Sequence, residues 1–145
     1  MAEAGGPATQ AGIYYQNSVA ALYLGRMLDL RPRAHRDRVV HVRVEAPTDV
    51  DDTVVETADG VRRFIQAKRS LKADGDAWRS LWAAFARQLA RHDANPEDRL
   101  SLVLGETTRL AHDFIECCDR TTGAVDDGEY LGRLTGAQRA VLEAI

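Results

Sequence analysis

Two short apolar runs separated by a strong turn signal constrain the fold of this chain more than any other feature. The runs 54–55 and 64–65 flank Asp59 and Gly60. Glycine accepts a positive φ angle at no steric cost, so an Asp-Gly pair between apolar runs is typical of a tight hairpin connection. The segment 45–68 is therefore predicted to form a β-hairpin, and the other elements must be arranged around it.

Polar side chains collect at the open end of this hairpin. The acidic run 49–52 precedes the first strand, and the second strand ends in Gln66, Ala67 and Lys68. Side chains alternate between the two faces of a strand, so Gln66 and Lys68 point the same way. An aspartate on the neighbouring strand would complete a patch suited to a hard cation and to phosphodiester hydrolysis. The same pattern also fits an ordinary surface hairpin with a solvated acidic loop.

The length of the turn decides which aspartate joins the patch. A two-residue loop would make 58 face 61 and would place Asp51 opposite Lys68. A three-residue loop with Gly60 in the left-handed region would make 57 face 61 and would place Asp52 opposite Gln66. Both loops are common, and a slip of one residue exchanges the two faces. We expect Asp52 to be the main ligand, with Asp51 as the second choice.

Periodicities on either side of the hairpin predict an α/β domain. Apolar residues recur at helical spacing over 13–30, 76–92 and 109–120, whereas 39–45 alternates strictly and 100–105 is a short apolar run. The order is helix, three strands, helix, strand and helix. It predicts a mixed central sheet flanked by helices, with the first three strands antiparallel and the fourth parallel to the third.

Composition divides the chain into three expected parts. Residues 1–11 are small and polar and are predicted to be a mobile tail, residues 12–122 a single domain, and residues 123–145 a linker with the start of a following helical region. The last apolar pattern is not closed by a cap or a polar tail. We therefore expect the chain to be the N-terminal part of a longer protein.

Composition also excludes several classes of protein. No apolar run is long enough to span a bilayer, and the N-terminus lacks the features of a signal peptide, so a cytoplasmic location without a membrane is expected. The two cysteines, Cys117 and Cys118, are adjacent and lie at no zinc-site spacing. Residues 1–92 carry 14 Lys and Arg against 11 Asp and Glu, whereas residues 93–145 carry 5 against 11. Cations therefore concentrate in the part that holds the polar patch.

The polar patch resembles the active site of the PD-(D/E)XK nuclease superfamily, in the Gln-x-Lys variant of Mrr-like restriction enzymes. An aspartate before a short strand, a turn, and Gln66-Ala67-Lys68 at the end of the next strand carry the resemblance. Glu45 closes the preceding strand, and a Gly-x-x-Tyr-Gln pattern ending at Gln16 opens the first helix. This sequence pattern is most similar to that of nuclease domains at the N-terminus of bacterial anti-phage defence proteins. The resemblance covers roughly residues 12–105.

The resemblance implies a restriction-endonuclease-like αβββαβ core and a metal-dependent DNA endonuclease effector domain. Asp52 and Gln66 would bind Mg²⁺, for which Mn²⁺ can substitute, and Lys68 would position the attacking water and stabilise the transition state. Glu45 and Asp51 are further candidates for the catalytic set.

The partner that the resemblance implies is double-stranded DNA. Arg43, Arg69 and Lys72 are the candidates for contacts to nucleic acid, and Gln16 is a candidate for support of the metal site. Cutting both strands in one event needs two active sites. We therefore expect a homo-oligomer, formed by self-association or through a missing C-terminal part.

An alternative function follows from the same residues. A glutamine in place of the commoner acid removes one formal charge from the metal site. The domain could then be a catalytically silent restriction-endonuclease-like module that binds DNA or a protein partner. Stabilisation by Mg²⁺ or Mn²⁺ would distinguish the two functions.

Overall fold

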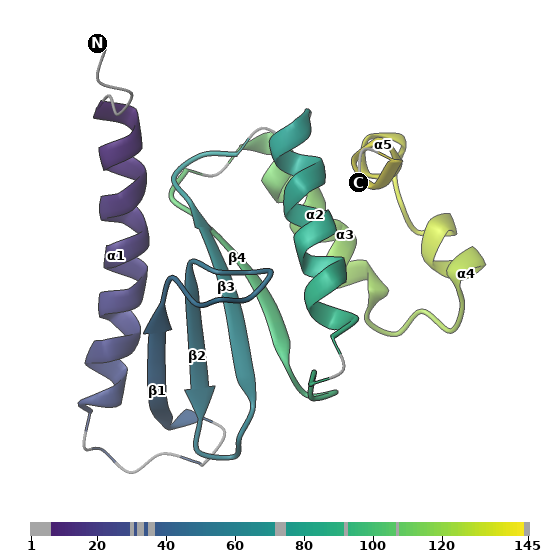
Figure 1. Ribbon diagram of the computed structural model, residues 1–145. Coiled ribbons are helices and arrows are strands. Elements are labelled where there is room, and N and C mark those ends of the chain that lie inside the picture. Colours follow the sequence, from purple (N-terminus) through teal and green to yellow (C-terminus); the bar gives the residue numbers. More distant parts are fainter. Residues whose placement is uncertain are drawn as a thin grey trace. The chain divides into compact units, whose positions relative to one another are not determined.

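The computed structural model describes residues 7–29, 31, 34, 37–71, 75–91, 93–106 and 108–143. These residues form an α/β fold with one four-stranded mixed sheet and five helices (Figure 1), so the predicted fold class is confirmed at this level. In chain order the elements are α1 Pro7–Met27, β1 Val39–Val44, β2 Thr53–Thr57, β3 Arg62–Lys68, α2 Asp76–Leu89, β4 Arg99–Leu104, α3 Arg109–Thr121, α4 Asp127–Gly132 and α5 Gly136–Glu143.

The sheet has the topology that the element order predicts. Its strand order is β1-β2-β3-β4, with β1–β2 and β2–β3 antiparallel and β3–β4 parallel. Short connections suffice for the two antiparallel pairs, whereas the parallel pair needs a longer crossover, which contains α2. The expected antiparallel meander followed by a parallel fourth strand is confirmed.

The hairpin turn has three residues. The Thr57 amide donates to the Val61 carbonyl oxygen at 3.0 Å, so 57 faces 61, and Val54 pairs with Phe64. Gly60 has a φ of 82°, the left-handed conformation that this loop requires. The register that places position 52 opposite position 66 is therefore confirmed, and the two-residue alternative is wrong.

A hydrophobic cluster joins α1 to one face of the sheet. Alternation places every second residue of β2 and β3 on this face, so the other residues of these strands point to the opposite side. The buried members of the cluster are Val19, Tyr23, Val39, Val55, Ile65 and Ala67.

The first helix is longer at its start than the sequence predicted. It begins at Pro7 rather than near Ile13, and it ends at Met27 rather than at Leu30. Proline favours the first helical position because its fixed φ suits the helix and its missing amide proton is not needed there. The expected tail 1–11 therefore overlaps the helix at residues 7–11, and residues 1–6 lie outside the described part.

The strand β1 departs from strict alternation. A register shift lies between Val39 and His41. Val39 is buried, whereas Val40 at the shift and Val44 at the end of this edge strand are exposed. A bulge of this kind is common in an edge strand, where it interrupts the free row of hydrogen-bonding groups. The prediction that alternate valines of 39–45 form one buried face is wrong for these two residues.

The chain separates into two compact units. The first contains residues 1–69 and 84–105, and the second contains residues 70–83 and 106–145. The domain boundary expected between residues 122 and 123 therefore falls inside the second unit. No described helix is both long enough and apolar enough to cross a membrane.

The second unit has its own aromatic cluster and its own helix caps. Trp78 and Trp82 pack edge to face at 5.3 Å, and Trp82 lies 4.9 Å from Phe114 of α3. Thr135 accepts from the Gln138 amide while Gln138 Oε1 accepts from the Thr135 amide, a reciprocal capping box that begins α5. Gln138 Nε2 also donates to Glu116 on α3 at 2.6 Å, which ties the two helices together.

Candidate functional site

The start of β2 fixes the position of Asp52. The Glu45 amide donates to the Asp52 carbonyl oxygen at 3.2 Å, and the Ala46 amide donates to the Asp51 carbonyl oxygen at 2.8 Å. Val50 and Thr53 on either side are fully buried. The backbone around Asp52 is therefore anchored both by the continuing β1–β2 ladder and by packing.

The Asp52 carboxylate is the centre of the predicted site. Its Oδ1 accepts from Gln16 Nε2 at 2.8 Å, and its Oδ2 accepts from Gln66 Nε2 and from the Ala67 amide, the latter at 2.7 Å. Lys68 Nζ lies 3.8 Å from the same Oδ2. The structure thus brings together four residues that the sequence singled out: Gln16, Asp52, Gln66 and Lys68.

These contacts hold the carboxylate in one orientation. The Asp52 side chain is only 10% exposed, and hydrogen bonds to an ionised acceptor are stronger than those between neutral groups. Lys68 is 39% exposed, so its ion pair contributes little to stability but leaves the ammonium group accessible. The arrangement combines a fixed anion with a cation that can reach a bound molecule.

The amide group of Gln66 faces Asp52 through its nitrogen rather than its oxygen. Gln66 is buried, and its hydrogen bond restricts the rotation of the Asp52 carboxylate. In this orientation Gln66 acts on Asp52 as a donor. A role as a metal ligand would need its Oε1 to turn toward the cation.

A hollow of about 350 Å³ lies beside Asp52. Gln16, Glu45, Asp51 and Asp52 line it together with apolar and amide side chains, so it holds three of the predicted carboxylates. Glu45 has a φ of 48°, the left-handed region, which costs energy for a residue other than glycine. Carboxylate oxygens around one hollow are the donor set that a hard cation such as Mg²⁺ prefers.

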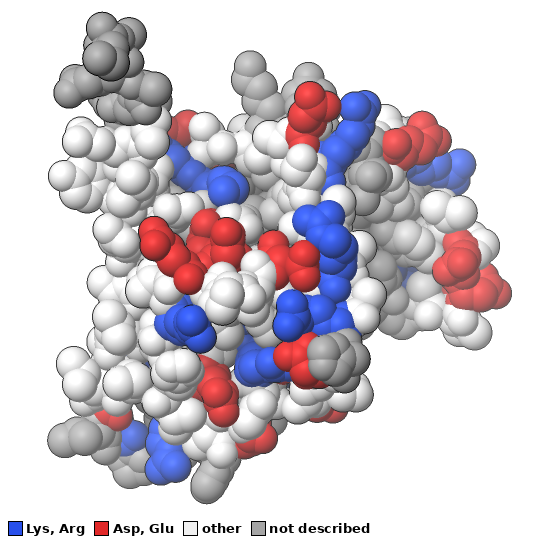
Figure 2. All heavy atoms as spheres, in the orientation of Figure 1, with Lys and Arg blue, Asp and Glu red and all other residues white. Residues whose placement is uncertain are grey.

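The acidic run before β2 splits into two roles. Figure 2 shows acidic side chains gathered over the connection from β1 to β2. Asp49 accepts from Arg87 Nε at 2.9 Å, and its amide donates to Gln88 Oε1 at 3.2 Å. Asp49 therefore anchors the connection to α2, whereas Asp51 and Asp52 remain at the hollow.

The structure describes two of the three candidate contacts to nucleic acid, Arg43 and Arg69. Arg43 is exposed on β1 and alternates with Val44, which lines the hollow, so the two side chains leave opposite faces of the strand. Arg69 is exposed directly after β3. Lys72 lies outside the described residues.

Gly105 packs closely against the end of β3. Its amide donates to the Lys68 carbonyl oxygen at 3.0 Å, and a Cβ at this glycine would lie 3.0 Å from the Arg69 carbonyl oxygen. This close approach fixes the backbone that carries Lys68. In the sequence of the apolar run 100–105, only the glycine itself indicates this close packing.

A group of potential metal ligands on α3 was not predicted. The side-chain ligand atoms of His112, Asp113 and Glu116 lie within 4.8 Å of one another. His112 Nδ1 is 3.5 Å from Glu116 Oε1, and Glu116 also accepts from Gln138. Because these exposed or half-buried groups already contact one another and α5, we assign them to the stability of the second unit.

Comparisons of the chain with protein-family models, with curated proteins and with solved structures found no match. The function must therefore be argued from the residues and the geometry of the site.

Proposed function

We propose that residues 12–122 form a metal-dependent DNA endonuclease effector domain with a restriction-endonuclease-like αβββαβ core, acting within a larger bacterial anti-phage defence protein. The observation that carries this proposal is the Asp52 carboxylate, which is held by Gln16 and Gln66 within ion-pair distance of Lys68. The order of helices and strands supports the same proposal.

The donor set around the hollow fits a hard cation. Asp52 would hold Mg²⁺, and Glu45 and Asp51 would supply further oxygens around the same hollow. When bound, the cation would activate a water molecule and neutralise charge on the phosphate. An ionised carboxylate accepts about four hydrogen bonds or metal bonds, so the contacts to Gln16, Gln66 and Ala67 leave capacity on Asp52.

The place of Lys68 beside Asp52 supports the proposal. Its ammonium group lies 3.8 Å from Asp52 Oδ2 and is partly exposed. It can therefore donate to an attacking water or to a phosphate oxygen beside the same carboxylate. A donor already placed where charge develops lowers the barrier because no reorganisation is needed during the reaction.

Cleavage of supercoiled plasmid tests the proposal. We expect nicking or linearisation by the purified protein with Mg²⁺ or Mn²⁺, and its loss with EDTA, in Asp52→Asn and in Lys68→Ala. The exposed Arg79→Gln, on α2, serves as the matched control that keeps activity. Cleavage that survives in both site variants would show that the site is wrongly assigned.

One observation favours the alternative of a silent binding module. Both oxygens of Asp52 already accept from protein donors, and Gln66 presents its nitrogen to them. The site is thus complete without a cation. Titration with Mn²⁺ separates the two functions: an active site should raise the melting temperature through Asp52, whereas a silent module should show no shift.

Self-association forms a further part of the proposal. α1 contains a single charged residue, Arg26, and exposes large apolar side chains such as Tyr14, Leu22 and Leu24. A second copy would present the same uncharged face, which suits a symmetric contact. Light scattering should find a dimer, and Leu22→Lys should reduce it to a monomer. A wild-type monomer at high protein concentration would exclude this contact.

A further inference from the structure

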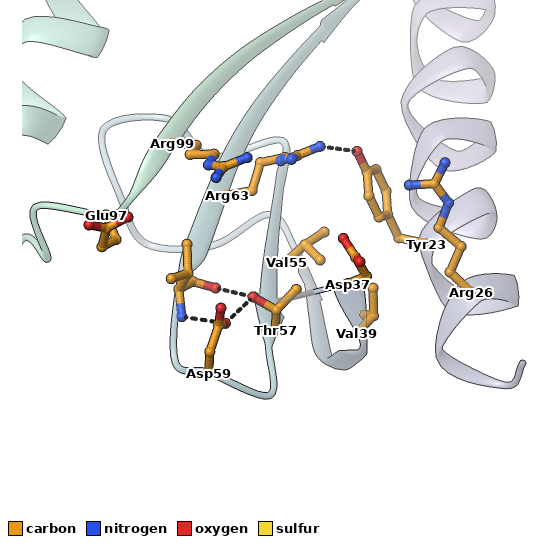
Figure 3. A pocket seen from close by; sticks show the side chains of 11 residues that line it. Tyr23, Arg26, Asp37, Val39, Val55, Thr57, Asp59, Arg63, Glu97 and Arg99 are labelled. Carbon is orange, nitrogen blue, oxygen red and sulfur yellow. Dashed lines mark hydrogen bonds between the residues drawn. The ribbon is translucent and has the colours of Figure 1, made fainter. Parts of the chain in front are cut away.

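A second hollow lies at the other end of the strands from Asp52. Its volume is about 530 Å³, and it lies between α1 and the sheet, beside the end of β2 and the starts of β3 and β4 (Figure 3). Buried Val39 and Val55 form part of its wall. Three guanidinium groups, those of Arg26, Arg63 and Arg99, reach it from three different elements.

Two of these arginines are neighbours across the sheet. Arg63 and Arg99 are register partners in the parallel β3–β4 pair, so both side chains leave the same face. Like charges opposite one another on adjacent strands are destabilising. Among the described residues, no ion pair joins Arg26, Arg63 or Arg99 to a carboxylate.

Two of the nearby acids, Asp98 and Asp59, have other contacts. Asp98 binds Arg62, on the other face of β3, at 2.7 Å. Asp59 accepts from the Thr57 hydroxyl at 2.7 Å, as Figure 3 shows. Arg63 instead donates to the Tyr23 hydroxyl at 3.5 Å, a long contact to a neutral group. The fold thus holds Arg63 and Arg99 side by side, and no ion pair to either arginine is found among the described residues.

We propose that this hollow binds the phosphate groups of a small nucleotide. Adjacent guanidinium groups match phosphate oxygens in geometry and charge, and Tyr23 would add a hydroxyl donor. The volume suits a ligand of nucleotide size. This site is independent of the Asp52 site and of the proposed nuclease activity.

The acids at the hollow select against a nucleic-acid strand. Asp37, Asp59 and Glu97 line it with the arginines, so the formal charges of the lining balance. A long polyanion crossing this surface would meet the carboxylates, whereas a nucleotide can place its phosphates on the arginines and its base amino groups near the acids. The chemistry therefore favours a small ligand that carries both kinds of group.

Calorimetric titration of the full chain in EDTA with ADP, GDP and inorganic pyrophosphate tests the proposal. We expect binding of at least one nucleotide, weakened about tenfold or more by Arg99→Gln and by Arg63→Gln. Arg79→Gln, which removes an exposed arginine elsewhere, should bind like the wild type. Lys68→Ala should also bind normally, because it lies at the other end of β3.

Three results would overturn the proposal. The first is no binding of any of the three ligands by the folded wild type at millimolar concentration. The second is unchanged affinity in Arg99→Gln, a variant that should fold because Arg99 is exposed. The third is a preference for pyrophosphate or for a single-stranded oligonucleotide over both nucleotides, which would assign the arginines to phosphate alone or to a nucleic-acid strand.

Discussion

The two ends of the central hairpin use charge in opposite ways. At the Asp52 end, one carboxylate is surrounded by Gln16, Gln66 and Lys68, and each donor matches it. At the other end, Arg63 and Arg99 lie side by side and no described carboxylate pairs with them. The first end brings opposite charges together, whereas the second places like charges side by side. Strand β3 takes part in both ends, because it carries Gln66 and Lys68 at the first and Arg63 at the second.

The largest effect is expected when the partly exposed ammonium group of Lys68, at the Asp52 end, is removed. Lys68→Ala should lower the rate of plasmid cleavage by about 100-fold or more, as loss of a preorganised charge at a reacting group does. The free energy of unfolding should fall by less than about 1 kcal/mol because Lys68 is partly exposed. Cleavage time courses and urea unfolding of the same preparation measure both. A similar rate for variant and wild type would remove Lys68 from the mechanism.

The next largest effect is expected from removing the carboxylate itself. Asp52→Ala leaves the buried Gln66 side chain and the Ala67 amide without their acceptor, which should cost roughly 2–4 kcal/mol of unfolding free energy. Asp51→Ala is the matched control, because Asp51 is exposed and should change stability by less than about 0.5 kcal/mol. Urea denaturation compares them, and equal stability of the two variants would contradict the geometry around Asp52.

A smaller effect, dependent on pH, is expected at the ion pair beside the arginine hollow. Burial raises the pKa of Asp98, but hydrogen bonds from Arg62 and from the Asn95 amide outweigh burial and hold this pKa below its usual range. Because the folded-state pKa is lowered, Asp98 stabilises the fold above its unfolded pKa, and this stabilisation is lost as the pH falls through the folded pKa.

Asp98→Asn should therefore reduce the free energy of unfolding by about 1–2 kcal/mol at neutral pH, since the partner Arg62 is partly exposed. Melting temperatures of variant and wild type should converge toward acidic pH. A constant difference between them down to strongly acidic pH would show that Asp98 acts through packing rather than through its charge.

The smallest effect should have the opposite sign. Arg99→Gln relieves the repulsion with Arg63, so in a buffer without phosphate it should raise the free energy of unfolding by about 0.2–1 kcal/mol. At the Asp52 end, substitution of Gln66 or Lys68 would instead remove a favourable contact with the carboxylate. Thermal unfolding with and without pyrophosphate measures the gain, and a less stable variant would show that the two arginines are satisfied as they stand.

Local chemistry made the Asp52 end predictable. Gly60 has a steric reason to adopt a positive φ, and turn length then sets which residues face each other, so the pairing of positions 52 and 66 followed from a few residues. The spacing of apolar residues predicts the order of helices and strands, and this order predicts the topology of the sheet. The contact of Gln16 with Asp52 was reached only through the resemblance, because helix periodicity does not say which polar residue meets a strand end.

The arginine hollow could not be predicted in the same way. The pairing of Arg63 with Arg99 depends on the parallel register across a crossover, which no local turn determines. The division of the chain into two units and the bulge in β1 also arise from tertiary packing. The start of α1 also differs from the prediction. The small and polar residues 1–11 are typical of a tail, but Pro7 suits the first helical position and begins the helix.

The three-residue turn has a consequence for how this protein can change over evolutionary time. Substitutions within residues 58–60 leave the spacing of the two strands intact, provided that a residue able to adopt the left-handed conformation stays at position 60. Loss or gain of one residue in the turn would instead change which side chain lies opposite Gln66. The effect would be felt about 20 Å along the strand from the turn. Natural variants should therefore drift freely in the composition of this turn while its length stays fixed.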